Sequence, residues 1–301
     1  IAVLQYKEEG QIIKRHPEYG MEERILLSAI RYDRGTVTID GKEYPMRDMN
    51  FPTVDPADPL RLTDEEEELL HTLELSFRHN ARLHEHVRFL YSNGSMYKCC
   101  NSNLLYHGCI PMTENREFDG LMVGGKMYRG KELMDFIDTQ VKNAYFLPED
   151  APEKEACRDF MWYLWNGAKS PVFGKDKNRS FEHYFIEDPE VMRETMNPYY
   201  QLSEEEETCD MILKEFGLPT KGSHIINGHM PVKIKSGETP IRAGGKLFII
   251  DGGLSKAYQE RTGIAGYTLI FNSHHLALAE HKPFDPERER TPKVYIVEKM
   301  Q

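Results

Sequence analysis

The sequence is poor in cysteine and has no long apolar run. Its 301 residues include five cysteines, an odd number without Cys-x-x-Cys spacing, which argues against a disulfide framework and against a structural zinc site. No stretch approaches the roughly 18 consecutive apolar residues of a membrane span, and no basic and apolar leader marks a secretory signal. These absences favour a cytoplasmic location with reduced thiols, and no membrane partner is expected.

The sequence also has fewer basic than acidic residues. The chain carries 38 Lys and Arg against 49 Asp and Glu, a formal net charge of −11. Nucleic acids and anionic membranes bind to clusters of basic side chains that release counterions, so no nucleic-acid partner is expected. An anionic small molecule would need local compensation, either from a few basic residues in a cleft or from divalent metal ions.

The order of the predicted elements is typical of an α/β protein. The content of hydrophobic residues, 40%, allows a sizeable core, and helical and strand periodicities alternate along the chain. The expected elements are helical spacing over 1–31 broken at His16 and Pro17, a hairpin over 36–44, a proline-rich connection over 45–62, a long and largely buried helix over 63–92, a hairpin over 121–128, helices near 130–146 and 153–166, an irregular stretch over 167–202, a helix over 204–216 ended by Gly217, and a closing hairpin of 267–271 with 274–280.

Two histidines lie at the ends of short apolar runs. His107 follows the run at 103–106 and His229 follows the run at 225–228, and each histidine has a glycine beside it. A strand that enters such a turn presents its imidazole at the rim of a sheet, where glycine lets the backbone bend and lets a metal ion approach. With twelve histidines in the chain neither pattern has much weight by itself, although two such strand ends allow a shared metal site.

The sequence around these histidines makes the predicted kind of protein more specific. The sequence reads His-Gly-Cys-Ile-Pro at 107–111, Asn-Gly-His-Met-Pro at 227–231, Asp-Gly-Gly-Leu-Ser-Lys at 251–256 and Gly-Ile-Ala-Gly-Tyr at 263–267. Over almost its whole length the chain resembles the bacterial class III fructose-1,6-bisphosphatases, which are calcineurin-like metallophosphatases. The resemblance implies the C-terminal half of a four-layer α/β/β/α sandwich at 96–301, preceded by an added helical segment with a β-hairpin at 1–95.

Three motifs of that superfamily are absent from the sequence. These are Asp-x-His, Gly-Asp-x-x-Asp-Arg-Gly, and Gly-Asn-His followed by Asp or Glu. The run Asp-Arg-Gly at 33–35 lacks the upstream Gly-Asp, so we interpret it as a turn. The resemblance then implies that the chain is the C-terminal part of a longer enzyme whose N-terminal part is missing here. The general acid is expected in that part, and no catalytic residue is assigned in this chain.

The resemblance also implies the chemistry. It implies hydrolysis of fructose 1,6-bisphosphate to fructose 6-phosphate and phosphate, a step of gluconeogenesis, at a pair of divalent metal ions, with manganese favoured. His107 and His229 would be ligands of one ion. The present chain alone is expected to be inactive.

Six basic residues are candidates for holding the two phosphates of the substrate. Lys256 has the strongest case because it lies in a glycine-bearing loop behind a strand. The candidates are Lys14 and Arg15 on the first helix, Lys175 and Arg179 in a polar loop, Lys233 after the second histidine, and Lys256.

Two alternatives stay open at this point. One keeps the fold and changes the substrate to a phosphoprotein or a dinucleotide. The other is a non-catalytic folded piece that acts as a regulatory or oligomerisation module. A homo-oligomer is compatible with the phosphatase prediction and with both alternatives. Cys109 lies next to this candidate site but shows no neighbouring base, so packing is the better interpretation of it than nucleophilic catalysis.

Overall fold

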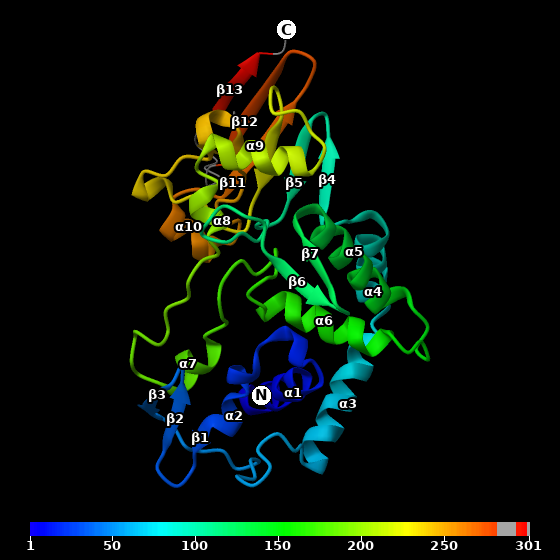
Figure 1. Cartoon of the computed structure of the whole chain (residues 1–301), viewed down its shortest axis with the longest axis vertical. Coiled ribbons are helices and arrows are strands. Elements are labelled where there is room, and N and C mark those ends of the chain that lie inside the picture. Colours follow the sequence, from blue (N-terminus) through cyan, green and yellow to red (C-terminus); the bar gives the residue numbers. More distant parts are fainter. Residues whose placement is uncertain (282–292, 300–301) are drawn as a thin grey trace, which may run out of the picture.

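A computed structural model describes residues 1–281 and 293–299 of the chain. The protein is elongated, with the first helices at one end and the largest sheet together with the C-terminal strands at the other (Figure 1). Helices and strands alternate, and parallel and antiparallel pairings both occur, which confirms the predicted α/β class. No helix of the described residues is long and apolar enough to cross a membrane.

The helices and strands have the following bounds. The helices are α1 (Ala2–Arg15), α2 (Leu26–Ala29), α3 (Asp64–Arg78), α4 (Ala81–Asn93), α5 (Gly130–Phe146), α6 (Lys154–Asn166), α7 (Ser180–Phe185), α8 (Tyr199–Leu202), α9 (Glu206–Glu215) and α10 (Lys256–Thr262). The strands are β1 (Ile30–Arg31), β2 (Thr36–Ile39), β3 (Lys42–Pro45), β4 (Tyr97–Cys100), β5 (Asn103–Tyr106), β6 (Gly120–Val123), β7 (Lys126–Arg129), β8 (His224–Asn227), β9 (Ile241–Arg242), β10 (Leu247–Ile249), β11 (Gly266–Phe271), β12 (His275–His281) and β13 (Lys293–Lys299).

A mixed five-stranded sheet positions the two histidines. Its order is β4-β5-β8-β10-β9. The three inner strands are parallel, with Leu104 opposite Ile225 and Leu247 opposite Ile225 on its other side, and all three residues are buried. Apolar runs of this kind are typical of strands covered on both faces. Because β5 and β8 are parallel neighbours, the turns that follow them meet at one edge of the sheet.

Helix α9 covers one face of this sheet. Its buried residues Cys209, Ile212 and Leu213 have the spacing of one helical face, and they belong to the same core as the sheet residues. The helix ends before Gly217, which has a left-handed φ of 73° that glycine adopts without steric cost. The predicted helix and its glycine stop are therefore confirmed.

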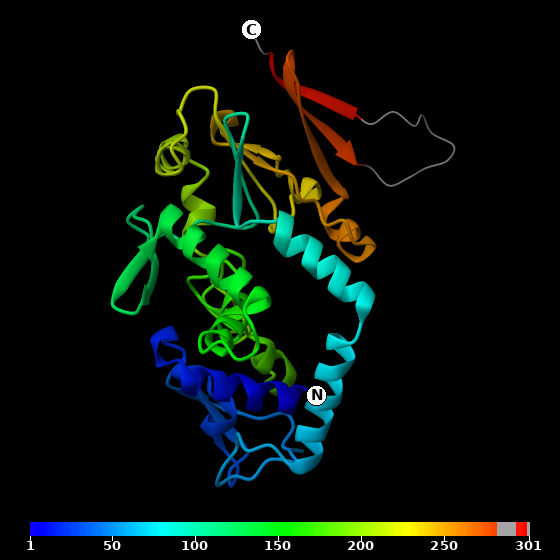
Figure 2. The same cartoon turned by 90° about the vertical axis from the view of Figure 1, so that its right-hand side faces the viewer.

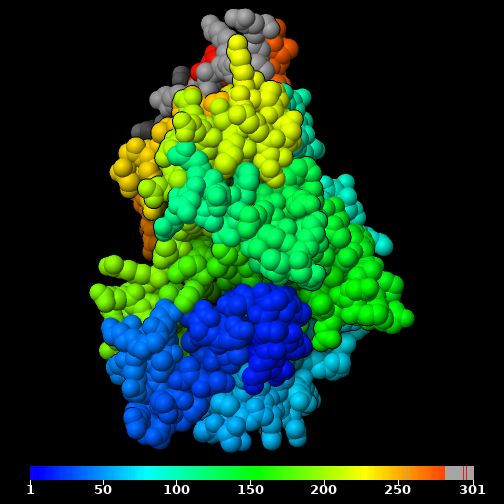
Figure 3. Space-filling view, in the orientation of Figure 1, coloured from blue at the N-terminus to red at the C-terminus, as the bar shows by residue number. Residues whose placement is uncertain are grey.

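A second core lies at the other end of the molecule. It combines residues of α1, α2 and β2 with Phe181, Ile186 and Val191 from the later part of the chain. In the space-filling view the N-terminal surface adjoins the segment near residue 180 (Figure 3). Residues 1–62 therefore share their core with a segment beyond 95, and the proposed boundary between 95 and 96 stays a prediction.

The prediction of one long buried helix over 63–92 is wrong. Thr63 does begin a helix, because its side chain and that of Glu66 form a capping box, as the acidic run after it suggests. The helix stops at His79, and Asn80 starts α4 by accepting a hydrogen bond from the main-chain N–H of Leu83. The two helices follow one another along one side of the molecule (Figure 2).

The apolar side chains of α3 and α4 are largely exposed instead of buried. The exposed fractions are 65% for Phe77, 71% for Phe89 and 60% for Leu90. Periodicity predicts which side chains share a face of a helix, but it does not say whether another element covers that face.

Most of the remaining expectations hold. The first helix breaks before Pro17, and only short helices follow it up to residue 29. The hairpins β2–β3, β6–β7 and β11–β12 pair as predicted, and β13 adds a third strand to the last of them. Helices α5 and α6 match the prediction. The stretch 167–202 is irregular except for α7 and α8, and residues 32–35 form a turn.

Candidate metal centre

The two predicted histidine ligands lie side by side. His107 follows β5 and His229 follows Asn227 and Gly228 at the end of β8. The Nε2 atom of His107 is 3.0 Å from the Nδ1 atom of His229, and the ring centroids are 4.9 Å apart. These residues are 122 positions apart in the sequence, and the parallel pairing of β5 with β8 brings them together.

The backbone of the two turns is joined directly. The N–H of Gly228 donates to the carbonyl of His107 over 2.9 Å. His229 has a left-handed φ of 65°, which is uncommon for a residue with a Cβ atom and occurs where the surroundings fix the backbone. At Gly108, a Cβ atom would lie 2.6 Å from the carbonyl oxygen of Pro171, so this position requires glycine.

A buried amide side chain fixes the two turns further. The Nδ2 group of Asn227 donates to the carbonyl of Gly108 over 3.2 Å and to the hydroxyl of Tyr199 over 2.8 Å. The hydroxyl of Tyr199 is also 2.6 Å from that of Tyr106. The sequence prediction missed Asn227, although its position directly before Gly228 and His229 is a signal that could have indicated it.

The hydrogen bonds of His229 define which of its nitrogens carries the proton. Its Nε2 atom is 3.2 Å from the main-chain carbonyl of Phe173, which can only accept, so Nε2 is the donor. The Nδ1 atom then presents its lone pair to His107. A carbonyl partner of this kind holds a ring in the tautomer that a metal ligand needs.

The surroundings keep His229 uncharged. Burial lowers the pKa of its imidazole, and the neighbouring His107 and the cation of Lys175 lower it further, against the opposite effects of the Phe173 carbonyl and of Asp251. A neutral imidazole is the form that coordinates metal ions.

The geometry fits two ligands of one metal ion. Nitrogens bound at about 2.0–2.1 Å from one ion, at an angle of about 90–109°, lie roughly 2.8–3.4 Å apart, and the observed separation is 3.0 Å. Within residues 1–281 and 293–299, however, no group of three or more His, Cys, Asp and Glu side chains is placed to hold an ion. The carboxylate of Asp251, which is near His229, accepts a hydrogen bond from Gly253. The metal-binding role of the two histidines stays a prediction.

Among the six basic candidates, Lys175 is one whose charge acts on the histidine pair. It is close enough to lower the pKa of His229, and its ammonium group pairs with Glu194. Lys233 is exposed and lines a pocket beside the histidine turn. Lys256 is the first residue of α10, and its side chain lies outside the described part of the structure.

The other three candidates lie elsewhere in the structure. Arg15 forms two hydrogen bonds of 2.9 Å with Asp159. Arg179 is buried and pairs with Asp40 and Glu182, each at 3.1 Å. These ion pairs connect α1 to α6 and the hairpin β2–β3 to α7. Lys14 is exposed on α1. Their role in holding phosphate stays a prediction.

Cys109 packs in the core as expected. It is fully buried, and burial raises the pKa of its thiol to about 12. A thiol with such a pKa is protonated at neutral pH and is a poor nucleophile.

The fold is of the α/β class, and its mixed sheet brings two imidazoles together at one edge. This arrangement makes the protein a candidate metalloprotein. The sequence matches the family model described as Firmicute fructose-1,6-bisphosphatase over residues 1–299. The chain belongs to this family.

Individual relatives agree with the family match. A fructose-1,6-bisphosphatase class 3 of Bacteroides fragilis is 52% identical over 284 residues, which is 94% of this chain and 43% of the relative. One from Clostridium beijerinckii is 52% identical over 285 residues, covering 95% of this chain and 43% of the relative. One from Clostridium acetobutylicum is 49% identical with the same coverage. The chain thus spans less than half the length of these relatives. No solved structure matches it.

Proposed function

We propose that this chain contributes two metal ligands to a fructose-1,6-bisphosphatase, a phosphomonoester hydrolase that releases phosphate from fructose 1,6-bisphosphate. The observation that carries the proposal is the 3.0 Å separation of the His107 and His229 nitrogens, in a chain of the fructose-1,6-bisphosphatase family. The names of the relatives support the substrate.

The chain's own residues have distinct parts in this proposal. His107 and His229 hold a divalent ion, for which manganese is our first choice. When bound, such an ion polarises the phosphoryl oxygens and lowers the pKa of water. Lys175 lies beside His229 and offsets negative charge on the phosphate. Lys233 and Lys256 are the next candidates for phosphate contact, and the general acid stays unassigned.

Activity requires further ligands. Two imidazoles are fewer than the three protein ligands that a catalytic metal ion usually has, and the described residues bring no third side chain to them. We infer that polypeptide corresponding to the rest of the relatives' length supplies the other ligands. With it, the central sheet would complete the four-layer sandwich of the calcineurin-like metallophosphatases.

The exposed faces of α3 and α4 are the surface that we assign to that polypeptide. Phe89 lies in an open groove with Tyr145 and Phe146 at the end of α5. Phe77 on α3 and Leu90 on α4 are exposed as well. Monomeric soluble proteins rarely leave such patches uncovered. A second copy of the chain is the competing occupant.

The thiols agree with a reducing compartment. All five cysteines are free, and Cys99 and Cys100 are exposed. We therefore propose a cytoplasmic location.

Metal binding by the chain itself tests the ligand assignment. Titration with Mn²⁺, followed by isothermal calorimetry and by the loss of the free-ion electron spin resonance signal, should give one weak site. His107→Ala and His229→Ala should each abolish it. His71→Ala is the matched control, since His71 is exposed on α3. Unchanged binding in either of the first two variants would show that the assignment is wrong.

Hydrolysis tests the substrate. The chain joined to the part of the Bacteroides fragilis relative that it does not match is assayed with fructose 1,6-bisphosphate, p-nitrophenyl phosphate and a phosphopeptide, with and without Mn²⁺. We expect Mn²⁺-dependent turnover that favours the sugar bisphosphate, and none from the present chain alone. Preference for the phosphopeptide would favour a different phosphatase, and absence of any turnover in the joined protein would favour a non-catalytic module.

A further inference from the structure

Asn197 links three segments that surround the histidine pair. Its Oδ1 atom accepts hydrogen bonds from the main-chain N–H groups of Met112, over 3.1 Å, and of Tyr199, over 3.0 Å. Its own main-chain N–H donates to the carbonyl of Gly174 over 2.9 Å. Asn197 is only 9% exposed, so water has little access to replace these bonds.

The first of these segments is the loop that begins at His107. The loop runs to Met112, which is buried, and its backbone is held at two points. The N–H of Cys109 donates to the carbonyl of Pro171 over 2.9 Å, and the N–H of Met112 donates to Asn197. Both bonds restrict the path of the backbone that carries His107.

The second segment carries the acceptor for His229. The carbonyl of Phe173 accepts the hydrogen bond from the Nε2 group of His229 over 3.2 Å. Directly after Phe173, residues 174–176 lie antiparallel to residues 195–197. The bond from Asn197 to the carbonyl of residue 174 is part of this pairing. Asn197 therefore holds the peptide that follows the acceptor of His229.

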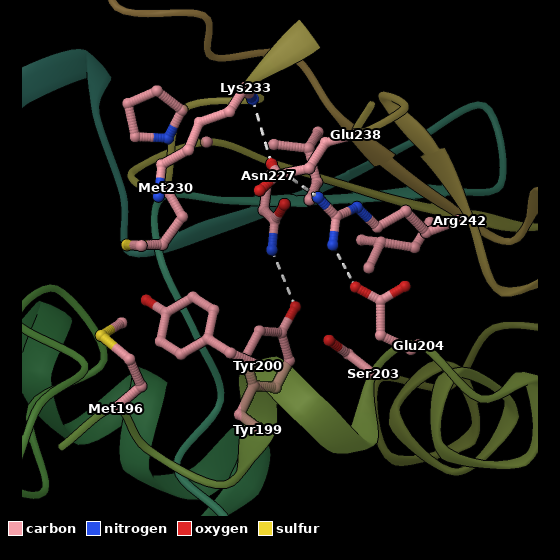
Figure 4. A pocket seen from close by; sticks show the side chains of 14 residues that line it. Met196, Tyr199, Tyr200, Ser203, Glu204, Asn227, Met230, Lys233, Glu238 and Arg242 are labelled. Atoms are coloured by element: carbon pink, nitrogen blue, oxygen red, sulfur yellow. Dashed lines mark hydrogen bonds and ion pairs between the residues drawn. The ribbon is translucent and has the colours of Figure 1, made fainter. Parts of the chain in front are cut away.

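The third segment is helix α8. Tyr199 is its first residue and is buried, and the hydroxyl of Tyr199 accepts a hydrogen bond from the Nδ2 group of Asn227 over 2.8 Å. Figure 4 shows the ring of Tyr199 extending from α8 toward the amide of Asn227, which precedes Gly228 and His229 in the chain. Because Asn197 binds the main-chain N–H of Tyr199, it fixes the start of the helix from which this ring extends.

We propose that Asn197 is a positioning residue of the candidate metal centre, whose three hydrogen bonds hold His107 and His229 at the separation that one divalent ion requires. It acts through the loop that follows His107, through the main chain next to Phe173, and through Tyr199 of α8. The inference rests on the proposed function for the metal ion, whereas the effect on the two rings is measurable without one.

Two substitutions of Asn197 separate the role of its acceptor from that of its volume. Asn and Asp side chains both bond to a main-chain N–H two residues further on, so Asn197→Asp keeps an acceptor for Tyr199 and for Met112. Asn197→Leu has a similar size but leaves both N–H groups without this partner, a state that a buried backbone disfavours. The segments that carry these N–H groups are then expected to shift.

Exchange of the His229 Nε2 proton with water tests the positioning in the full chain of 301 residues without metal. In protein labelled with ¹⁵N-histidine this proton, held by Phe173, should exchange slowly, and the spectrum of His229→Ala assigns it. Asn197→Leu should accelerate its exchange by about tenfold, and Asn197→Asp should leave it near the original rate. Rates are compared with those of the amide protons of β10, because a general loss of stability accelerates both.

Asn178→Leu is the matched control. Asn178 makes the same local contact, since it accepts a hydrogen bond of 2.9 Å from the main-chain N–H of Ser180 at the start of α7, but its Nδ2 group bonds to Asn166 of α6. Equal acceleration in Asn178→Leu and Asn197→Leu, or none in Asn197→Leu, would overturn the proposal. If Asn197→Leu does not fold, Asn197→Ser takes its place. Serine makes the same local bond more weakly, so a smaller acceleration is expected, and none would count against the proposal.

Calorimetric titration with Mn²⁺ separates this inference from the proposed function. Asn197→Asp should bind the ion as the unsubstituted protein does, and Asn197→Leu about 10–100-fold more weakly, the usual effect of losing a group that orients a metal ligand. Equal affinity of Asn197→Leu and the unsubstituted protein would refute the positioning role and leave the metal ligands as assigned. Absence of binding in every variant and in the unsubstituted protein, together with the expected exchange rates, would refute the proposed function and support the positioning of the rings by Asn197.

Discussion

The side chain of Asn227 is hydrogen-bonded to the main-chain carbonyl of Gly108 over 3.2 Å. This bond joins the turn that carries His107 to the turn that carries His229, and it adds to the backbone bond between Gly228 and His107. The two turns are therefore joined by contacts that do not involve the imidazoles, in addition to the 3.0 Å contact between the rings and the bond of His229 to the Phe173 carbonyl.

Replacing Asn227 by aspartate should weaken metal binding without removing a ligand. The substitution keeps the shape of the side chain but replaces its N–H donors with a carboxylate that repels the Gly108 carbonyl. Loss of a group that orients a metal ligand typically costs 10–100-fold in affinity, so we expect a fall in Mn²⁺ affinity of about that size, measured by calorimetry. Asn93→Asp is the control, since Asn93 also donates to a main-chain carbonyl, on α4. Similar affinities in both variants would argue against a positioning role.

The two glycines next to the histidines should differ in their tolerance of alanine. A Cβ atom at Gly108 would meet the Pro171 carbonyl at 2.6 Å, whereas one at Gly228 would make only a contact of ordinary length, 3.6 Å, with Asp251. Gly108→Ala should therefore lower the free energy of unfolding by about 1–3 kcal/mol, and Gly228→Ala by much less. Urea denaturation of both variants checks this. Equal losses would show that the Pro171 contact does not constrain the turn.

The histidine pair was predicted from two signals together, the apolar runs before each histidine and the resemblance to the fructose-1,6-bisphosphatase family. Each histidine follows a short apolar run, and strands of that kind are identified from local composition. Residues 103–106 and 224–227 do form neighbouring strands, so the convergence of His107 and His229 follows from the parallel pairing.

The contacts that complete the site could not be predicted in this way. Asn227 acts through Gly108, which is 119 residues away, and Arg179 is paired with Asp40, which is 139 residues away. The break between α3 and α4 occurs at Asn80, whose side chain caps α4. The apolar spacing continues across this break, so the hydrophobic pattern does not indicate it. Long-range pairing and capping thus decide features to which hydrophobic patterns are insensitive.

The ion pair of Lys7 and Glu66 should make stability depend on pH. Lys7 is fully buried and its ammonium lies 2.7 Å from Glu66. Burial raises the pKa of Glu66, but the hydrogen bond and charge of Lys7, with help from Thr53 and Thr63, outweigh it and lower the pKa overall. The stabilisation is therefore complete above the pKa of the unfolded chain, about 4.3, and is lost as the pH falls through the lower folded value.

Glu66→Gln isolates this contribution. Glutamine preserves the capping box with Thr63 but leaves Lys7 buried without a counter-charge, which typically costs 3–5 kcal/mol. We expect the free energy of unfolding of the variant to be lower by roughly that amount at neutral pH. On acidification, the free energy of unfolding should then fall less in the variant than in the unsubstituted protein. Glu65→Gln is the control, because Glu65 is exposed on the same helix. Urea denaturation at neutral pH and below about pH 4 measures both effects, and parallel pH profiles for the two variants would refute the assignment to Glu66.

The apolar surface of α3 and α4 predicts a separation between folding and association. Phe89 is 71% exposed, so Phe89→Ser should change the free energy of unfolding of this chain by no more than about 0.5 kcal/mol. By contrast, Phe248→Ala empties a fully buried site and should cost about 3–5 kcal/mol. If the remaining polypeptide of the family covers this surface, Phe89→Ser will weaken its binding to the chain when the two are mixed, as measured by calorimetry. If Phe89→Ser instead dissociates a dimer of the chain alone in analytical ultracentrifugation, the occupant is a second copy.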